Sequence, residues 1–329
     1  MAKAIAMFSG GLDSVLAARV VMEQGVELHG LSFVTEFFSS DPEKFTKRIH
    51  EIAGEINLPL DVLDISSEFL AMLEKPRYGY GANFNPCIDC KILMLNKAKE
   101  LMAGLGASFV ITGEVLGERP MSQRKDALNS VEKWSGLKGY LLRPLSAKLL
   151  PPTKPETEGL VDRERLLDLS GRGRKRQFEL AEKFGIEKHF TPAGGCLLTD
   201  PGFTRRLEDL AKHGKIKLED VRLLKYGRHF RLDSATKFVL GRDEKDNAGV
   251  VSEQKENDAI FFPHGFGGPI GLLRGDASDA NLNKAAGFLL THSKARGKSR
   301  ASVGVKSASG KRIITVKPAP REEIEAKRI

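Results

Sequence analysis

A glycine-rich hexapeptide near the amino terminus constrains the fold of this chain more than any other feature. Residues 9–14 read Ser-Gly-Gly-Leu-Asp-Ser, between an apolar run at 4–8 and a segment with helical spacing at 12–24. This pattern predicts a strand, a tight turn and a helix, in which backbone N–H groups and the helix amino terminus face an anion. The Gly-Lys-Ser/Thr ending of a Walker A loop and the three spaced glycines of a Rossmann turn are both missing.

Each polar position of the hexapeptide suits a polyphosphate. Gly10 and Gly11 allow a tight turn that presents N–H groups, and the hydroxyls of Ser9 and Ser14 are further donors. A carboxylate beside phosphates, here Asp13, indicates a magnesium ligand or an orienting group. The hexapeptide therefore predicts a binding site for the phosphates of a nucleotide together with Mg²⁺. The alternative is an ordinary strand-to-helix turn in which Ser and Asp act only as caps.

Strand and helix patterns alternate through the first half of the chain. This alternation predicts an α/β fold, with a parallel sheet covered by helices on both faces. Ligands of such sheets bind at the carboxyl ends of the strands. We predict strands over 4–8, 27–34, 60–65 and 108–112, helices over 12–24, 42–56, 68–73 and 91–105, and a loop over 76–89.

The second half has a different pattern. After a Pro-rich connection, residues 162–170 and 174–184 are predicted as amphipathic helices, and 191–200 as a Pro/Gly loop. From 237 onward, glycines and short β segments with one helix near 282–292 predict a smaller α+β domain. We therefore predict a nucleotide-binding domain with a helical extension over 1–232 and a second domain over 233–329.

Charge is unevenly distributed over the 329 residues. The chain has a formal net charge of +9, with a net of −1 over residues 1–150 and +10 over 151–329. Residues 294–329 alone hold 11 Lys and Arg against three Glu. Such asymmetry favours a polyanionic partner, nucleic acid first, over a merely solvated basic surface. The sequence contains no signal-peptide pattern and no apolar run long enough for a membrane span, so a cytoplasmic protein without a membrane partner is expected.

The three cysteines occupy loop-like positions. Cys87 and Cys90 form a Cys-x-x-Cys pair at a helix start beside Lys91, where a thiolate is favoured, and Cys196 follows two glycines. Three thiolates with one open position suit a 4Fe–4S cluster. Alternatively Cys90 or Cys196 carries a persulfide that another thiol resolves as a disulfide. Buried structural cysteine is the third interpretation.

The hexapeptide resembles the signature of the PP-loop ATP pyrophosphatases, which have an adenine nucleotide alpha hydrolase-like fold. The segments 111–117 with Ser122-Gln123, and 142–145, resemble the 4-thiouridine synthetase (ThiI) family. Residues 85–90 resemble the catalytic segment of the 2-thiouridylase (MnmA) family, which places the catalytic cysteine at Cys90. The resemblance covers roughly residues 1–200 and adds Gly113 and Gln123 to the expected nucleotide-binding residues.

This resemblance implies an ATP-dependent, AMP-forming tRNA sulfurtransferase that acts on uridine, with 4-thiouridine favoured over 2-thiouridine. The catalytic residues would be Asp13, Cys90, Cys196 and Cys87. Sulfide or a cysteine desulfurase would donate the sulfur, and relatives suggest a homodimer. No segment of the 329 residues resembles the THUMP or rhodanese-like regions of the thiouridine synthetases, so the cluster is expected rather than the persulfide. A small-molecule ligase and a non-catalytic RNA-binding protein stay open as alternatives.

The C-terminal part resembles the RNA-binding domain of NFACT proteins. The matching segments are 241–243 with Asn247, 257–265, Pro269, Arg274-Gly275 and the helix around 285–286. The resemblance implies RNA recognition, and the basic and stackable side chains nearby are the expected contacts. The alternative is that Arg242 and His264 only stabilise the fold. The predicted RNA-binding residues are Arg242, His264, Arg274, Lys298 and Arg300.

Overall fold

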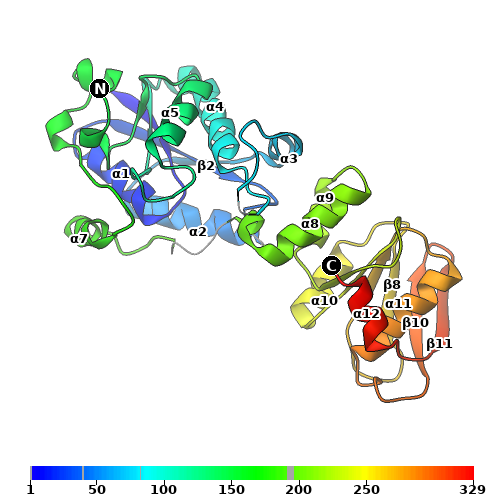
Figure 1. The fold of residues 1–329 in the computed structure, drawn as a ribbon. Coiled ribbons are helices and arrows are strands. Elements are labelled where there is room, and N and C mark those ends of the chain that lie inside the picture. Colours follow the sequence, from blue (N-terminus) through cyan, green and yellow to red (C-terminus); the bar gives the residue numbers. More distant parts are fainter. Residues whose placement is uncertain (1, 39–40, 82, 191–195) are drawn as a thin grey trace. The chain divides into compact units, whose positions relative to one another are not determined.

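The computed structural model describes residues 2–38, 41–81, 83–190 and 196–329 (Figure 1). The chain divides into two compact units, 1–199 and 200–329. Residues 191–195, half of the loop predicted over 191–200, lie outside the described residues. No helix in the described ranges is both long and apolar enough to cross a membrane.

The first unit is built on a five-stranded sheet in the order β3-β2-β1-β4-β5, with every neighbouring pair parallel. The central strand is apolar from Ala4 to Met7 because both faces of the sheet are covered: Ala4 and Ala6 face one hydrophobic cluster, and Ile5 faces another. The strands are β1 (Lys3–Met7), β2 (Glu27–Val34), β3 (Leu60–Asp64), β4 (Phe109–Thr112) and β5 (Leu141–Leu142).

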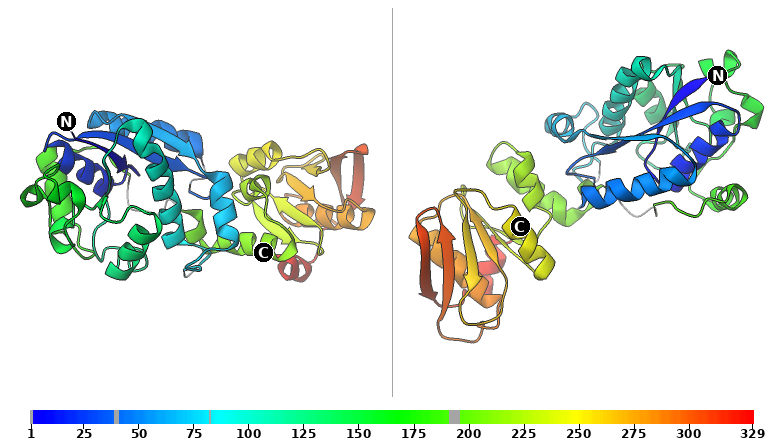
Figure 2. Two further views of the ribbon diagram at one scale, coloured as in Figure 1. Left: turned by 90° about the horizontal axis from the view of Figure 1, so that it is seen from above. Right: turned by 180° about the vertical axis from the view of Figure 1, so that it is seen from behind.

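Helices cover both faces of this sheet (Figures 1 and 2). Buried side chains of α1, α2 and α7 pack on one face, and those of α4 and α5 on the other. The predicted α/β fold is therefore confirmed. The helices are α1 (Leu12–Met22), α2 (Pro42–Glu55), α3 (Ser66–Glu74), α4 (Cys87–Leu105), α5 (Lys125–Trp134), α6 (Lys154–Thr157) and α7 (Lys175–Phe184), with 3₁₀ turns at Ala147–Leu149, Arg163–Arg165 and Leu197–Thr199.

The prediction of a helix over residues 162–170 is wrong. Only the short turn Arg163–Arg165 forms there. The backbone N–H groups of Leu167 and Leu169 donate to the carbonyl oxygens of Pro144 and Leu145, at 2.9 and 2.8 Å, instead of to a preceding helical turn. Buried leucines therefore follow the neighbouring segment in extended form, and their helix-like spacing in the sequence is incidental.

The second unit contains a six-stranded antiparallel sheet in the order β11-β10-β8-β9-β7-β6. One face packs against α11 through phenylalanines and leucines, and the other packs against α9 and α10. This is the predicted α+β architecture. The strands are β6 (Arg228–Arg231), β7 (Lys237–Leu240), β8 (Ala259–Pro263), β9 (Gly271–Arg274), β10 (Ala301–Ser307) and β11 (Gly310–Val316).

Two features of the second unit differ from the prediction. Beyond residue 237 the structure has the one predicted helix and two further helices of nine and seven residues. The division at 199/200 also differs from the predicted boundary at 232/233, because β6 pairs with β7 across that boundary. The helices are α8 (Pro201–His213), α9 (Leu218–Leu223), α10 (Glu244–Ser252), α11 (Asp279–Thr291) and α12 (Arg321–Lys327).

Candidate active site

The hexapeptide forms the predicted tight turn between β1 and α1, which we call the phosphate loop after the role expected of it. Gly10 has a φ of +71°, and Gly11 is the residue that precedes the first turn of α1. The hydroxyl of Ser14 donates to the carbonyl oxygen of Gly11 at 2.8 Å, and the hydroxyls of Ser9 and Ser14 lie 3.2 Å apart. Hydroxyl and N–H groups therefore gather at the amino terminus of α1. Such an arrangement can bind phosphate oxygens.

Asp13 lies beside a second carboxylate and an arginine that the sequence analysis did not select. Arg174 Nη2 is 3.4 Å from Asp13 Oδ2, and Arg174 Nε is 3.9 Å from Glu118 Oε1. Burial raises the pKa of Asp13, although Arg174 and Arg119 oppose this. Burial and the nearby Asp13 also raise the pKa of Glu118. The two acids therefore lack a full countercharge.

Three polar atoms of this group are buried without a hydrogen-bond partner among the described residues. They are Asp13 Oδ1, Glu118 Oε2 and Arg174 Nε. Buried polar atoms are normally satisfied, so open ones in a loop of this kind indicate a place for a ligand. Magnesium at nucleotide sites takes one or two carboxylates together with phosphates and water. The two open carboxylate oxygens fit such an ion, and the open N–H of the guanidinium fits a phosphate.

Gly113 allows a close approach between β4 and the phosphate loop. A Cβ atom at this position would lie 2.5 Å from the backbone nitrogen of Ser14 and 2.6 Å from the carbonyl carbon of Asp13. Gln123 closes the following loop, since its Oε1 accepts the Arg119 N–H at 2.8 Å. That loop carries Glu118 toward Asp13. The two predicted nucleotide-binding residues thus shape the site, while their contact with nucleotide stays a prediction.

A buried ion-pair network braces the same strand ends. Glu114 contacts Lys91 through one carboxylate oxygen, and its other oxygen accepts from Arg143 Nε at 2.9 Å. Arg143 also reaches Glu132 at 3.2 Å. Burial would raise the pKa of Glu114, but the charges of Lys91 and Arg143 outweigh it and hold the pKa at about 2. The network joins α4 to the loops after β4 and β5.

The Cys-x-x-Cys pair begins α4, four residues earlier than the predicted helix start. Asp89 in the first turn accepts the backbone N–H groups of Arg77 and Tyr78, both at 2.9 Å. These bonds hold the preceding loop against the helix. Asn85 Nδ2 donates to Cys87 Sγ at 3.3 Å. Both cysteines therefore lie in the first turn of α4, and the Cys87 sulfur is held there by Asn85.

The segment that follows Cys196 is bound to the same region. The Leu197 N–H donates to the carbonyl oxygen of Phe37 at 2.8 Å, and Asn83 Nδ2 donates to that of Thr199 at 3.0 Å. Burial raises the pKa of Cys90 far above its usual range, and the thiols of Cys196 and Cys87 raise it further. Burial and Cys87 raise the pKa of Cys196 to about 11. The fold thus brings the three cysteines into one neighbourhood.

The thiols are not arranged as a finished metal site. Within the described ranges, no group of three or more His, Cys, Asp or Glu side chains is disposed to hold a metal ion. The number of thiols, three, matches the ligands of a 4Fe–4S cluster with one open iron. The donor set therefore fits a cluster, and binding of a cluster stays a prediction.

The five predicted RNA-binding residues lie in the second unit. Two of them form ion pairs with acids of the fold, and the other three are exposed. Arg242 pairs with Asp246, and Arg274 is held by Asp258 and Asp220 at 2.7 and 2.8 Å. Both arginines thus stabilise the fold. The other three, His264, Lys298 and Arg300, are exposed. Their role in RNA binding stays a prediction.

Two families match separate parts of the chain. Residues 1–148 match the family described as thiamine biosynthesis protein (ThiI), and residues 227–328 match the one described as NFACT protein RNA binding domain. Both resemblances drawn from the sequence motifs are confirmed. The second match begins at β6, within the second unit.

Curated relatives are tRNA-specific 2-thiouridylases. The chain is 30% identical over 131 residues to that of Geotalea uraniireducens (strain Rf4), covering 34% of each protein. It is 25% identical over 285 residues to that of Legionella pneumophila (strain Paris), covering 79% of this chain and 70% of the relative. The chain therefore spans between about a third and 70% of the length of these relatives.

Among solved structures, a 4-thiouridine synthetase–RNA complex with bound ATP is similar to this chain. The identity is 21%, the TM-score is 0.38, and the match covers 68% of this chain and 52% of the other.

Proposed function

We propose that this chain, a ThiI-like PP-loop protein with an NFACT-type RNA-binding domain, is a cytoplasmic tRNA sulfurtransferase that adenylates a uridine carbonyl with ATP and replaces its oxygen with sulfur. The observation that carries the proposal is the phosphate loop with its open Asp13 and Glu118 oxygens, in the unit that also gathers three cysteines. The two family matches and the names of the curated relatives support the same reaction class.

The first half of the reaction uses the phosphate loop. The N–H groups at the start of α1 and the hydroxyls of Ser9 and Ser14 would bind ATP phosphates, and Arg174 would neutralise charge on them. Asp13 and Glu118 would hold Mg²⁺, which supplies further charge neutralisation when bound. The uridine oxygen attacks the α-phosphorus, pyrophosphate leaves, and the base is left with AMP as a good leaving group.

The second half uses sulfur. A hydrosulfide or persulfide sulfur attacks the adenylated carbon, and AMP leaves with the former uridine oxygen. In the persulfide route, a second cysteine attacks the protein-bound sulfur, which frees the thiouridine and leaves a disulfide that a cellular thiol must reduce. Cys90 and Cys196 are the candidates for these two roles. In the cluster route, Cys87, Cys90 and Cys196 would be the ligands, and a sulfide donor supplies the sulfur.

Two findings bear on the uridine position. The family match over 1–148 favours 4-thiouridine, whereas the names of the curated relatives favour 2-thiouridine. We retain 4-thiouridine as the first candidate. Nucleoside mass spectrometry of tRNA from a strain that lacks this gene distinguishes the two. The strain should lack 4-thiouridine in the first case and 2-thiouridine in the second. An unchanged profile would contradict tRNA thiolation and favour a small-molecule substrate.

The ATP step is tested by Asp13→Asn. We expect tRNA-dependent AMP formation to fall at least a hundredfold, since the variant loses a carboxylate that no neighbour replaces. Asp126→Asn is the control, because Asp126 is an exposed acid of the same unit whose one ion-pair partner among the described residues is Arg124. Binding of tRNA should be unchanged in both variants. Persistent AMP formation in Asp13→Asn would show that the loop is not the site of adenylation.

The two sulfur routes are separated by the colour of the protein. A cluster predicts a brown protein after anaerobic purification, with broad visible absorbance that is lost in Cys87→Ala. A colourless protein with full thiolation activity contradicts the cluster and leaves the persulfide route. That route predicts a thiol-reducible disulfide after a single turnover.

A further inference from the structure

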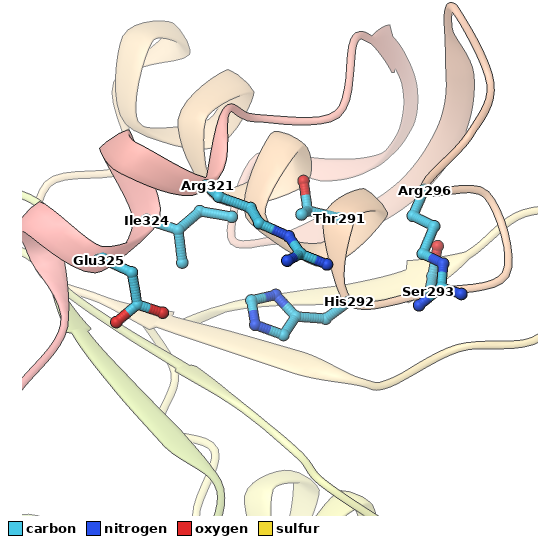
Figure 3. Close-up of a pocket in the computed structure, with 7 residues that line it drawn as sticks. All are labelled: Thr291, His292, Ser293, Arg296, Arg321, Ile324 and Glu325. Atoms are coloured by element: carbon cyan, nitrogen blue, oxygen red, sulfur yellow. The ribbon is translucent and has the colours of Figure 1, made fainter.

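Two adjoining pockets open in the second unit, where the end of α11 meets the start of α12. The first has a volume of about 380 Å³ and lies between the α11 end and α12 (Figure 3). The second, of about 570 Å³, shares Thr291, Arg296 and Arg321 with the first and continues along the 297–299 and 317–319 segments. Together they form one basic depression, which is defined by the residues of these two pockets.

The walls of the basic depression are fixed by the fold. Thr291 Oγ1 donates to the carbonyl oxygen of Ala319 at 2.8 Å, and the Ala319 N–H donates to that of Gly287 at 3.0 Å. A Cβ atom at Gly287 would lie 3.3 Å from the carbonyl oxygen of Lys317, so the glycine allows this close approach. On the other side, Ser293 Oγ accepts the Ala295 N–H at 3.0 Å. The depression is therefore preformed.

Four cations line the basic depression and are not used by the fold. They are Arg296, Lys298, Lys317 and Arg321. Among the described residues, none of these four side chains has a salt-bridge or side-chain hydrogen-bond partner, in contrast to Arg242 and Arg274. Figure 3 shows the Arg321 side chain extending from α12 toward Thr291 and His292. All four side chains are exposed, and a group of cations of this kind attracts an anion.

One acid lines the depression, Glu325, and its ion pair is with an arginine outside the four cations. Glu325 lines only the first pocket, and its carboxylate lies 3.3 Å from Arg328. Burial lowers the pKa of His292, and the charges of Arg228 and Arg328 add to this, so its ring is neutral at pH 7. The depression thus combines cations with the neutral His292 ring and the apolar Ile324, a composition suited to a phosphate joined to a less polar group.

We infer that the basic depression binds the phosphodiester backbone of an unpaired RNA segment, with Arg296 and Arg321 contacting phosphate and His292 facing the attached nucleoside. The inference rests on the proposed function, which supplies RNA as the partner, and it assigns the contact to residues other than Arg242 and Arg274. Phosphate contacts of this kind position an RNA without reading its sequence. Binding should therefore vary little with base composition.

The test compares two double variants of the full-length protein. Arg296→Ala/Arg321→Ala removes two cations from the depression. Lys215→Ala/Lys245→Ala removes two exposed cations outside it and has the same net charge. Fluorescence anisotropy with unmodified tRNA and with a single-stranded oligonucleotide is measured over a range of salt concentrations. Thermal unfolding shows whether each variant is folded.

We expect the depression variant to bind roughly tenfold more weakly at 0.15 M salt, with a log–log salt slope shallower by about 1.4, that is about 0.7 per lost contact to a single strand. The control variant should change far less. Equal weakening in both variants would overturn the inference, because the effect would then follow net charge alone. Unchanged binding in the depression variant would also overturn it.

The outcome is distinguishable from failure of the proposed function. At saturating tRNA the depression variant should still form AMP at the normal rate, and only its KM for tRNA should rise. If the unsubstituted protein forms no AMP in the presence of tRNA, the proposed function is contradicted. Inorganic phosphate at millimolar concentration is also added as a competitor of the labelled RNA. If it displaces the labelled RNA as strongly as unlabelled RNA does, the depression is a site for the free anion, and the assignment to RNA is overturned.

Discussion

Gly10 and Gly11 are neighbours in the phosphate loop, but only Gly10 lies where a side chain is excluded. Gly10 has a φ of +71°, and a Cβ atom there would lie 2.6 Å from the ring of Phe190. The ring cannot easily move away, because it stacks on Phe45 at 5.2 Å and lies under the guanidinium of Arg48. Gly11 has a φ of −74°, and its Cβ would meet only Ser9 Oγ, at 3.5 Å.

Gly10→Ala should therefore lower the free energy of unfolding by about 2–4 kcal/mol, of which about 1–2 is the left-handed backbone and the rest the overlap with Phe190. Gly11→Ala is the control and should change it by less than about 0.5 kcal/mol. Urea denaturation of both variants measures the difference. Equal losses would mean that the loop has a different conformation from the one described.

At the residue scale, local motifs were predictable and distant partners were not. Ser9–Ser14 and the Cys-x-x-Cys pair were found because their chemistry is contiguous in the sequence. Arg174 was missed because it lies 161 residues from Asp13 and belongs to no motif. Glu118 directly follows the 111–117 segment that the sequence analysis selected, and that position was the one signal available for it.

At the scale of elements, Glu114 joins three parts of the first unit. Its carboxylate contacts Lys91 of α4 and Arg143 after β5, and Glu114 itself follows β4. Glu114→Gln keeps the shape but leaves Lys91 without this carboxylate and Arg143 with only Glu132 among its described carboxylate partners, so we expect a loss of about 3–5 kcal/mol in the free energy of unfolding. Glu132→Gln, which removes a more exposed partner of Arg143, should cost less. Thermal and urea unfolding measure both variants.

The same carboxylate predicts a dependence of stability on pH. The pKa of Glu114 is about 2 in the folded protein, against an ordinary value of 4.5. Because the folded-state pKa is depressed, ionised Glu114 stabilises the fold fully above about pH 4.5, and this contribution is lost as pH falls toward 2. The stability difference between the wild type and Glu114→Gln should therefore narrow over that range. A difference that stays constant with pH would contradict the assigned charge state.

The errors in element prediction have a common physical origin. Residues 162–170 have helix-like leucine spacing, but their N–H groups find partners in the 144–145 segment. The start of α4 was placed four residues late because the preceding loop is rich in Gly, Asn and Pro. Asp89 stabilises that start by accepting N–H groups from Arg77 and Tyr78, and such a non-local partner leaves no local pattern.

At the scale of the whole molecule, the alternating pattern and the uneven charge were sufficient to predict two units of different class. The position of the division was not predictable, because it depends on strand pairing. β6 pairs with β7 across 232/233, Arg231 of β6 pairs with Asp209 of α8, and the side chain of Phe230 is completely buried. These contacts assign residues 200–232 to the second unit.

This division predicts how fragments of the chain behave. Residues 200–329 contain the whole second unit, so this fragment should unfold in one cooperative transition. A fragment of residues 233–329 lacks β6 and Phe230, whose ring lies 5.2 Å from that of Phe288. Loss of one buried phenylalanine alone costs about 3–5 kcal/mol, a large share of the 5–15 kcal/mol that stabilises a typical domain. The missing strand also leaves the edge of β7 unpaired.

Circular dichroism during heating, together with amide hydrogen exchange, compares the two fragments. We expect a cooperative transition and protected amides in β7, β8 and β9 only for residues 200–329. Equal cooperativity in the 233–329 fragment would place the boundary where the sequence suggested and would make α8, α9 and β6 dispensable. If residues 200–329 fold alone, they also allow RNA binding by the basic depression to be measured without ATP turnover, because every residue of the depression lies within that fragment.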